Sequence, residues 1–258
     1  MHPKLITIGS FSLPTYGLLV ALGFLAGLSV TLRLAKRAGL PAEQITNLAI
    51  YCALAGIAGA KVFMFLFDWQ FYLQNPGEFF SWATLQAAGV FHGGLIAALI
   101  FAVLYIRRHA LPPLGTMDCF APGIALGHAI GRVGCFAAGC CWGKECHLPW
   151  AVTFHSQEAA QVPINVPLHP TQLYETGANL ILFGILYRLF NRTHREGEVI
   201  GWYLVLYSIV RFIIEFFRNH EQSLVAGLSL TQWIAFGLLI LGAGILVRVR
   251  SIALAPQH

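Results

Sequence analysis

Ionisable side chains interrupt the apolar segments of this sequence, and they are densest in the segment "YSIVRFIIEFFR". Four polar residues follow one another there at offsets of four, four and three positions: Tyr207, Arg211, Glu215 and Arg218. These offsets predict that the four side chains lie on one face of a helix. Two arginines beside one glutamate leave a positive charge, so the face could bind an anionic group such as a phosphate. The alternative is an ion-pair ladder that only neutralises its own charges.

A second polar stretch, "GRVGCFAAGCCWGK", places Arg132 beside a group of thiols. Four cysteines with the spacing C-x4-C-C-x4-C lie at or beyond the end of an apolar segment: Cys135, Cys140, Cys141 and Cys146. This spacing matches neither the usual zinc patterns nor the plant-type iron–sulfur pattern. In an oxidising compartment we expect one or two disulfides that brace the following loop. A metal site that includes His147 or His155, and a reactive thiol, are the alternatives. Cys52 and Cys119 are predicted to be packing residues.

These residues belong to a chain with the composition of a membrane protein. Of its 258 residues, 57% are hydrophobic and 10% are charged, whereas a soluble domain has about 25% charged residues. We predict an all-α integral membrane protein with a single membrane domain, residues 1–258, and seven transmembrane helices. The predicted spans lie near residues 14–34, 45–67, 87–106, 115–138, 172–190, 199–218 and 229–248. The longest connection is the loop 139–171.

Basic residues are distributed unevenly between the two ends of these spans. Ten of the sixteen lysines and arginines lie on one side: Arg33, Lys36, Arg37, Arg107, Arg108, Arg188, Arg192, Arg195, Arg248 and Arg250. Only Lys4, Lys144 and Arg218 lie on the other. The positive-inside rule therefore predicts an outside N-terminus, a cytoplasmic C-terminus and an outside loop 139–171. No basic block is long enough to follow a nucleic-acid backbone, so we expect no nucleic acid as a partner.

With this orientation, the polar residues inside the spans fall mostly in the outer half of the bilayer. The ionisable ones are Lys61, His92, His128, Arg132, Glu175, Arg211 and Glu215. Such residues are costly in a membrane and usually functional, so we predict a polar cavity that opens to the outer leaflet. His92 precedes a Gly-Gly pair that would let a helix or a ligand approach closely, although a structural histidine is the alternative. The segment "HPTQLYE" reads as the interfacial start of the fifth span.

Several motifs together resemble the prolipoprotein diacylglyceryl transferases, a family of bacterial membrane enzymes. They are "PTYGLL", "AGAKVFMFLF", "FHGGLIAA", "GRVGCFAAGCCWG", "HPTQLYE" and "LYSIVRFIIEFFR", in matching order and spacing over most of the chain. The signature departs from the family pattern at three positions. Cys135 stands where the family usually has asparagine, Cys140 where it usually has glutamate, and Ala138 where asparagine is often found.

The resemblance implies seven spans, with the N-terminus outside and the C-terminus inside. It also implies transfer of the diacylglyceryl group of phosphatidylglycerol to the lipobox cysteine of a prolipoprotein, with release of glycerol phosphate. The implied location is the bacterial inner membrane, with the active site facing the periplasmic leaflet and membrane lipids around it. No metal or other cofactor is expected, because the phosphate is already a leaving group and arginines supply the positive charge.

By motif, the resemblance also implies which residues line the site: Tyr16, His92, Arg132, Cys135, Gly143, Tyr207, Arg211, Glu215 and Arg218. Arg132 and Arg211 would clamp the phosphate and stabilise its charge as it departs. His92 is the candidate general base for the incoming thiol. Gly143 would close the turn of the signature.

Two other classes of function remain as alternatives. One is a non-catalytic, redox or metal-handling membrane protein that keeps the lipid cavity and uses the outer cysteines. The other is a lipid or small-molecule transporter, which is disfavoured because a permeation path would also need polar groups in the inner half of the membrane.

Overall fold

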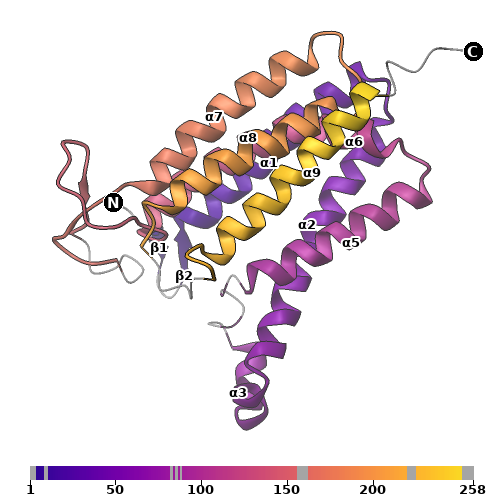
Figure 1. The fold of residues 1–258 in the computed structure, drawn as a ribbon. Helices are drawn as coiled ribbons and strands as arrows, with labels where there is room; N and C mark the ends of the chain where they lie inside the picture. The colour runs from indigo at the N-terminus through magenta and orange to yellow at the C-terminus, as the bar shows by residue number, and fades with distance from the viewer. Residues whose placement is uncertain are drawn as a thin grey trace, which may run out of the picture. The chain divides into compact units, whose positions relative to one another are not determined.

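The computed structural model in Figure 1 describes residues 4–8, 11–81, 84, 87, 89–155, 162–219 and 225–251. The protein is mostly helical and divides into two compact units. Unit 1 comprises Met1–Ala38 and Met117–His258, and unit 2 comprises Gly39–Thr116. The prediction of a single membrane domain stays a prediction.

Five helices in the described ranges are long and apolar enough to cross a membrane. They are α1 (Thr15–Arg37), α2 (Ala42–Phe67), α5 (Phe91–Arg108), α6 (Pro113–Ala138) and α9 (Leu230–Ser251). Two further helices, α7 (Thr171–Phe190) and α8 (Glu198–Glu215), occupy the positions of the fifth and sixth predicted spans. The helices therefore lie where the apolar segments predicted them, with ends that differ from the predicted ones by up to four residues; α5 begins four residues later than expected and α8 ends three residues earlier.

The predicted all-α class is confirmed as a mostly helical fold, and short elements that the sequence did not predict fill the connections. Strands β1 (Lys4–Ile8) and β2 (Phe11–Pro14) form one antiparallel pair, and β3 (Val152–Thr153) and β4 (Pro167–Leu168) form another. Helix α3 (Trp69–Gln74) and the 3-10 helix η1 (Pro76–Phe80) follow α2. The physical reason is that non-helical backbone must find hydrogen-bond partners, and strand pairs supply them. The predicted loop 139–171 includes β3 and β4, and its residues 156–161 lie outside the described residues.

Glycines set the helix contacts in unit 2. A Cβ atom on Gly59 of α2 would lie 2.6 Å from the carbonyl oxygen of Gly93, and one on Gly94 of α5 would lie 2.7 Å from that of Gly56. No real side chain tolerates such distances, so the two backbones touch only because these residues are glycine. The Gly-Gly pair after His92 thus serves the approach of a neighbouring helix, which was one of the two roles left open.

The same principle joins α1 to α6 and α8 to α9 in unit 1. A Cβ on Gly27 of α1 would lie 2.6 Å from the carbonyl oxygen of Gly123, and one on Gly242 of α9 would lie 2.9 Å from that of Gly201. Helices α7, α8 and α9 run side by side (Figure 1). Close glycine contacts therefore fix the backbones of α6, which carries Arg132, and α8, which carries Arg211.

A buried carboxylate fixes the register between α6 and α8. Asp118 of α6 is 1% exposed and accepts hydrogen bonds from the backbone N–H groups of Gly197, at 2.6 Å, and Ile200, at 2.7 Å. These N–H groups lie at the start of α8, where helical partners are missing. Arg132 follows Asp118 by 14 residues and Arg211 follows Gly197 by 14 residues, which is about 21 Å of helix in each case. The cap therefore brings the two arginines to the same height.

We expect Asp118→Ala to destabilise the protein by about 1–3 kcal/mol, because two buried N–H groups lose their acceptor. The stability of Asp118→Asn, which keeps one oxygen acceptor, should lie between that of Asp118→Ala and that of the original chain. Thermal unfolding in detergent measures the effect, and Glu43→Asn, at an exposed position in α2, is the control. Equal stability of Asp118→Ala, Asp118→Asn and the original chain would contradict the capping role.

Candidate active site

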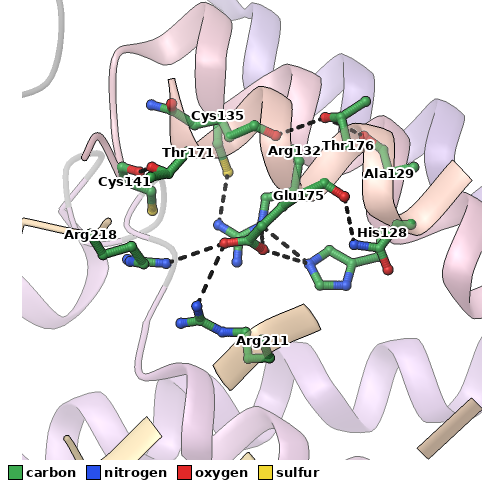
Figure 2. Close-up of polar contacts among 12 residues, drawn as sticks. His128, Ala129, Arg132, Cys135, Cys141, Thr171, Glu175, Thr176, Arg211 and Arg218 are labelled. Atoms are coloured by element: carbon green, nitrogen blue, oxygen red, sulfur yellow. Dashed lines mark hydrogen bonds and ion pairs between the residues drawn. The ribbon is translucent and has the colours of Figure 1, made fainter. Parts of the chain in front are cut away.

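Glu175 of α7 is the centre of a buried ion-pair cluster in unit 1. Its side chain is 3% exposed, and its Oε2 lies 2.6 Å from Nε of Arg132. Its Oε1 lies 3.6 Å from Nη1 of Arg218 and 3.8 Å from Nη1 of Arg211 (Figure 2). The three guanidinium groups come from α6, from α8 and from the turn after α8. One carboxylate of α7 thus connects α6 with α8 and the turn that follows it.

Glu215 is the second carboxylate of the cluster. Its Oε2 lies 2.9 Å from Nη1 of Arg211, one helical turn earlier, and 4.0 Å from Nε of Arg218. Its Oε1 accepts a hydrogen bond from Ser229 Oγ at 3.0 Å. Arg211 and Glu215 therefore share a helix face, as their spacing predicts.

The prediction that Arg218 lies on the same helical face as Arg211 and Glu215 is wrong, because α8 ends at Glu215 and Arg218 lies beyond it. The backbone leaves the helix to pair with the loop after α6, where Lys144 N–H donates to Phe217 O at 2.8 Å. Gly143 forms an antiparallel bridge with Arg218. The arginine still reaches both glutamates, but from a loop pairing instead of a helical turn.

His128 and Tyr207 complete the polar cluster beside Arg132. Nε of Arg132 donates a hydrogen bond to Nε2 of His128 at 3.2 Å, and this nitrogen also lies 3.6 Å from Oε2 of Glu175. The rings of His128 and Tyr207 lie 5.6 Å apart. The imidazole thus packs between the arginine and the tyrosine of the neighbouring helix.

In the part of the chain that the structure describes, the cluster carries more positive than negative charge. Three guanidinium groups face two carboxylates. The side chains of Arg132, Arg211 and Arg218 are 16%, 13% and 15% exposed, so water screens them little. A buried surplus charge is costly unless a counter-charge accompanies it. The cluster can therefore hold one anionic group, which a self-neutralising ladder could not.

Comparison with known proteins identifies the family of the chain that carries this cluster. A family model described as prolipoprotein diacylglyceryl transferase matches residues 3–248. The chain belongs to the prolipoprotein diacylglyceryl transferase family. The resemblance recognised in the sequence motifs is thereby confirmed, and with it the assignment to a family of membrane transferases.

Curated relatives of this family are similar over nearly their whole length. The phosphatidylglycerol–prolipoprotein diacylglyceryl transferase of Clostridium tetani is 32% identical over 242 residues, which cover 94% of this chain and 95% of the relative. The transferase of the same name from Bordetella parapertussis is 31% identical, over 95% of this chain and 94% of the relative. That of Methylobacillus flagellatus is 32% identical, over 95% of each.

The structure brings most of the predicted site residues of this family member together in unit 1. Tyr16 lies in the first turn of α1, where its ring is 3.4 Å from a Cβ position on Gly134 of α6. Nη1 of Arg132 lies 4.0 Å from Sγ of Cys135. His92 lies in unit 2, exposed in the first turn of α5 with its ring against that of Phe91. The catalytic role of His92 stays a prediction.

Gly143 differs from its expected role in the signature motif of the family. The turn is made by Gly139 and Cys141, with φ of 69° and 61°, whereas Gly143 lies in the bridge to Arg218. A Cβ on Gly143 would lie 2.6 Å from both the Cβ of His169 and the carbonyl oxygen of Phe217. Close approach of three backbone segments, and not a turn, requires glycine here.

The cysteines also differ from the expectation. All six lie in the described ranges and are free thiols, in place of the predicted disulfides. Sγ of Cys146 accepts a hydrogen bond from Leu148 N–H at 3.4 Å, and Cys119 is fully buried, as a packing residue should be. Hydrogen bonds with Cys135 and Cys140 lower the pKa of the Cys141 thiol, and the charges of Arg218 and Arg132 lower it further. Hydrogen bonds with Cys135 and Cys141 raise the pKa of the Cys140 thiol.

Glu175 and His128 are the site residues that sequence reasoning did not assign. Both were recognisable as ionisable residues inside apolar segments, which is the available signal. Glu175 belongs to "HPTQLYE", which reads as the start of a helix, and its partners on α6 and α8 are far away in the sequence. Only the fold shows that these helices bring arginines to it.

We expect Glu175→Gln to destabilise this family member by about 3–5 kcal/mol, because removing one partner of a buried pair leaves uncompensated charge. Thermal unfolding of the purified protein measures the loss. Glu145→Gln is the matched control, since that side chain is 61% exposed. A change in unfolding temperature no larger than that of the control would show that the cluster does not depend on this carboxylate.

Gly143→Ala should destabilise the protein by about 1–3 kcal/mol, because the added methyl group overlaps neighbouring backbone atoms. Gly184→Ala in α7 is the control, because no described atom lies within 4 Å of its Cβ position. There alanine should be neutral or stabilising by up to about 1 kcal/mol. If both variants unfold at the same temperature, the bridge between Gly143 and Arg218 is not tightly packed.

Proposed function

We propose that this chain transfers the diacylglyceryl group of phosphatidylglycerol to the lipobox cysteine thiol of a prolipoprotein. Glycerol phosphate leaves in the reaction. The relatives in Clostridium tetani and Bordetella parapertussis are named for this lipid and this protein substrate. The observation that carries the proposal is the surplus positive charge of the buried cluster around Glu175.

The cluster suits a phosphate that gains charge during the reaction. The thiol sulfur forms a bond to the glyceryl carbon as the carbon–oxygen bond to the phosphate breaks, and the phosphate keeps the electron pair. The phosphodiester has one negative charge, and the departing phosphate has more. Fixed guanidinium groups therefore stabilise the transition state more than they stabilise the bound lipid.

The three arginines differ in how tightly the glutamates hold them. Arg132 and Arg211 each lie within 3 Å of a carboxylate oxygen, whereas the contacts of Arg218 with the glutamates are 3.6 Å and 4.0 Å long. The two tight pairs orient their guanidinium groups, which can still donate from their remaining N–H groups. We infer that Arg132 and Arg211 clamp the phosphate, and that Arg218 is the arginine that shifts most readily to meet it.

A base must accept the proton of the incoming thiol. Nε2 of His128 already accepts a hydrogen bond from Arg132, so its lone pair is occupied. His92 is exposed in the first turn of α5, which leaves its ring accessible to a substrate. We therefore propose His92 as the general base. Tyr16 and Tyr207 would line the lipid site beside Cys135, with Gly143 supporting it from the loop.

The proposed reaction belongs to the outer leaflet of the bacterial inner membrane. Helices α1, α5 and α9 end in basic residues, among them Arg37, Arg108 and Arg250. The positive-inside rule puts these ends in the cytoplasm. With α7 and α8 as the remaining spans, the chain has seven, with the N-terminus outside and the C-terminus inside. Arg132 and Arg211 then lie on the side of the periplasmic leaflet.

Complementation of a bacterial cell depleted of its own transferase tests the proposal. We expect the original chain to restore lipoprotein modification, followed by mass spectrometry of a reporter lipoprotein. Arg132→Ala and His92→Ala should lower the rate of modification by at least about 100-fold, the size of a lost charge stabiliser or a lost general base.

Arg188→Ala is the matched control, because this arginine is exposed in the last turn of α7. It should modify the reporter at the original rate. Membrane levels of every variant are compared by immunoblot. A well-expressed original chain that leaves the reporter unmodified would contradict the proposed function.

A further inference from the structure

Three thiols that take no chemical step in the proposed reaction lie together beside the arginine cluster. The Sγ atoms of Cys135, Cys140 and Cys141 all lie within 4.8 Å of one another. Cys135 is on the last turns of α6, and the other two follow in the turn beyond it. The sequence spacing hides this arrangement, because the left-handed conformations of Gly139 and Cys141 fold the turn back onto the helix.

The arrangement is close to that of a metal site with three sulfur ligands. Metal–sulfur bonds of about 2.3 Å place the sulfurs of a tetrahedral or trigonal site about 3.8–4.0 Å apart. Sulfurs within 4.8 Å of one another need to move inward by less than about 1 Å to reach that spacing. Rotation about the Cα–Cβ bonds can supply such a shift.

The backbone of the turn is held in place by buried side chains of α7. Gln172 Nε2 donates to the carbonyl oxygen of Cys140 at 2.6 Å, and Thr171 Oγ1 donates to that of Cys141 at 2.9 Å. The exposed fractions of Gln172 and Thr171 are 1% and 0%. Cys141 has a φ of 61°, which is costly for a residue other than glycine. Such strain persists only where the surroundings enforce it, and it is typical of functional sites.

A disulfide fits this cluster less well than a metal ion does. Cys140 and Cys141 are adjacent, and neighbouring Cα atoms are about 3.8 Å apart, below the usual span of a disulfide. Any disulfide within the cluster would also leave one thiol over, whereas a metal ion uses all three. Three thiolates with Zn²⁺ or Cu⁺ carry a net charge of minus one or minus two. The positively charged cluster lies beside them, with Nη1 of Arg132 4.0 Å from Sγ of Cys135, which favours such an anionic centre.

We propose that Cys135, Cys140 and Cys141 form a binding site for one thiophilic d10 metal ion, Zn²⁺ or Cu⁺. Thiolate ligands favour these ions over harder cations. The site goes beyond the proposed transferase function and does not depend on it. It lies one helical turn from Arg132, so a bound ion would rigidify the segment that links the arginine to Gly143.

Metal binding by the purified, tag-free and fully reduced protein tests the proposal under anaerobic conditions. Zn²⁺ and Cu⁺ are added separately in competition with a chromophoric chelator. We expect one tightly bound ion per chain for at least one of the two metals, and the tighter of them identifies the ion. X-ray absorption of that complex should show a shell of three sulfurs at about 2.3 Å.

Cysteine variants locate the site. Loss of an outer-shell partner weakens metal binding by about 10–100-fold. Cys140→Ser and Cys141→Ser each remove a direct ligand, so each should weaken binding by more than that. Cys52→Ser, at a thiol in unit 2, is the matched control and should bind as the original chain does. Circular dichroism verifies that each variant is folded.

Three results would overturn the site: no stoichiometric binding of either ion, unchanged affinity in both Cys140→Ser and Cys141→Ser, or a metal shell dominated by nitrogen and oxygen. None of these measurements uses transferase activity. A failure of this proposal is therefore distinguishable from a failure of the proposed function.

Discussion

The carboxylate of Glu175 is the constraint on which the rest of the site depends. Arginines inside a membrane protein are costly, and those of one cluster repel one another. Glu175 offsets this cost because its two oxygens lie within 4 Å of Arg132, Arg211 and Arg218. The carboxylate fixes α7 between α6 and the end of α8. Together with Glu215, it leaves one of the three positive charges uncompensated. The same cluster thus combines buried ion pairs with a surplus positive charge.

The backbone places this carboxylate's partners through contacts far from the cluster itself. Asp118 sets the start of α8 against α6 about four turns below the arginines. Gly143 lets the loop after α6 approach closely enough to pair with Arg218. Because helices are stiff, a register set at one end is kept at the other. The site is therefore positioned from both ends of the same two helices.

The sequence predicts what depends on local pattern. Apolar length marks the helices to within a few residues, and the spacing of Arg211 and Glu215 marks one helical face, because helix geometry is periodic. Pairing between distant segments is not encoded locally. It pairs the backbone of Arg218 with the loop after α6 and brings Glu175 to its arginines. The three thiols, whose spacing resembles no metal motif, are brought together by the left-handed turn at Gly139 and Cys141. Each of these depends on a turn or a helix contact that only the fold reveals.

The most direct test of the proposed function is the reaction of the purified protein with phosphatidylglycerol and a lipobox peptide. The phosphatidylglycerol carries an isotope label in its glycerol headgroup, and both products are followed by mass spectrometry. The proposed function predicts a peptide whose cysteine gains one diacylglyceryl group, with an equal amount of labelled glycerol phosphate. The positive control is an active preparation of a relative under the same conditions. If the relative gives both products and the folded chain gives neither, the proposed function is contradicted.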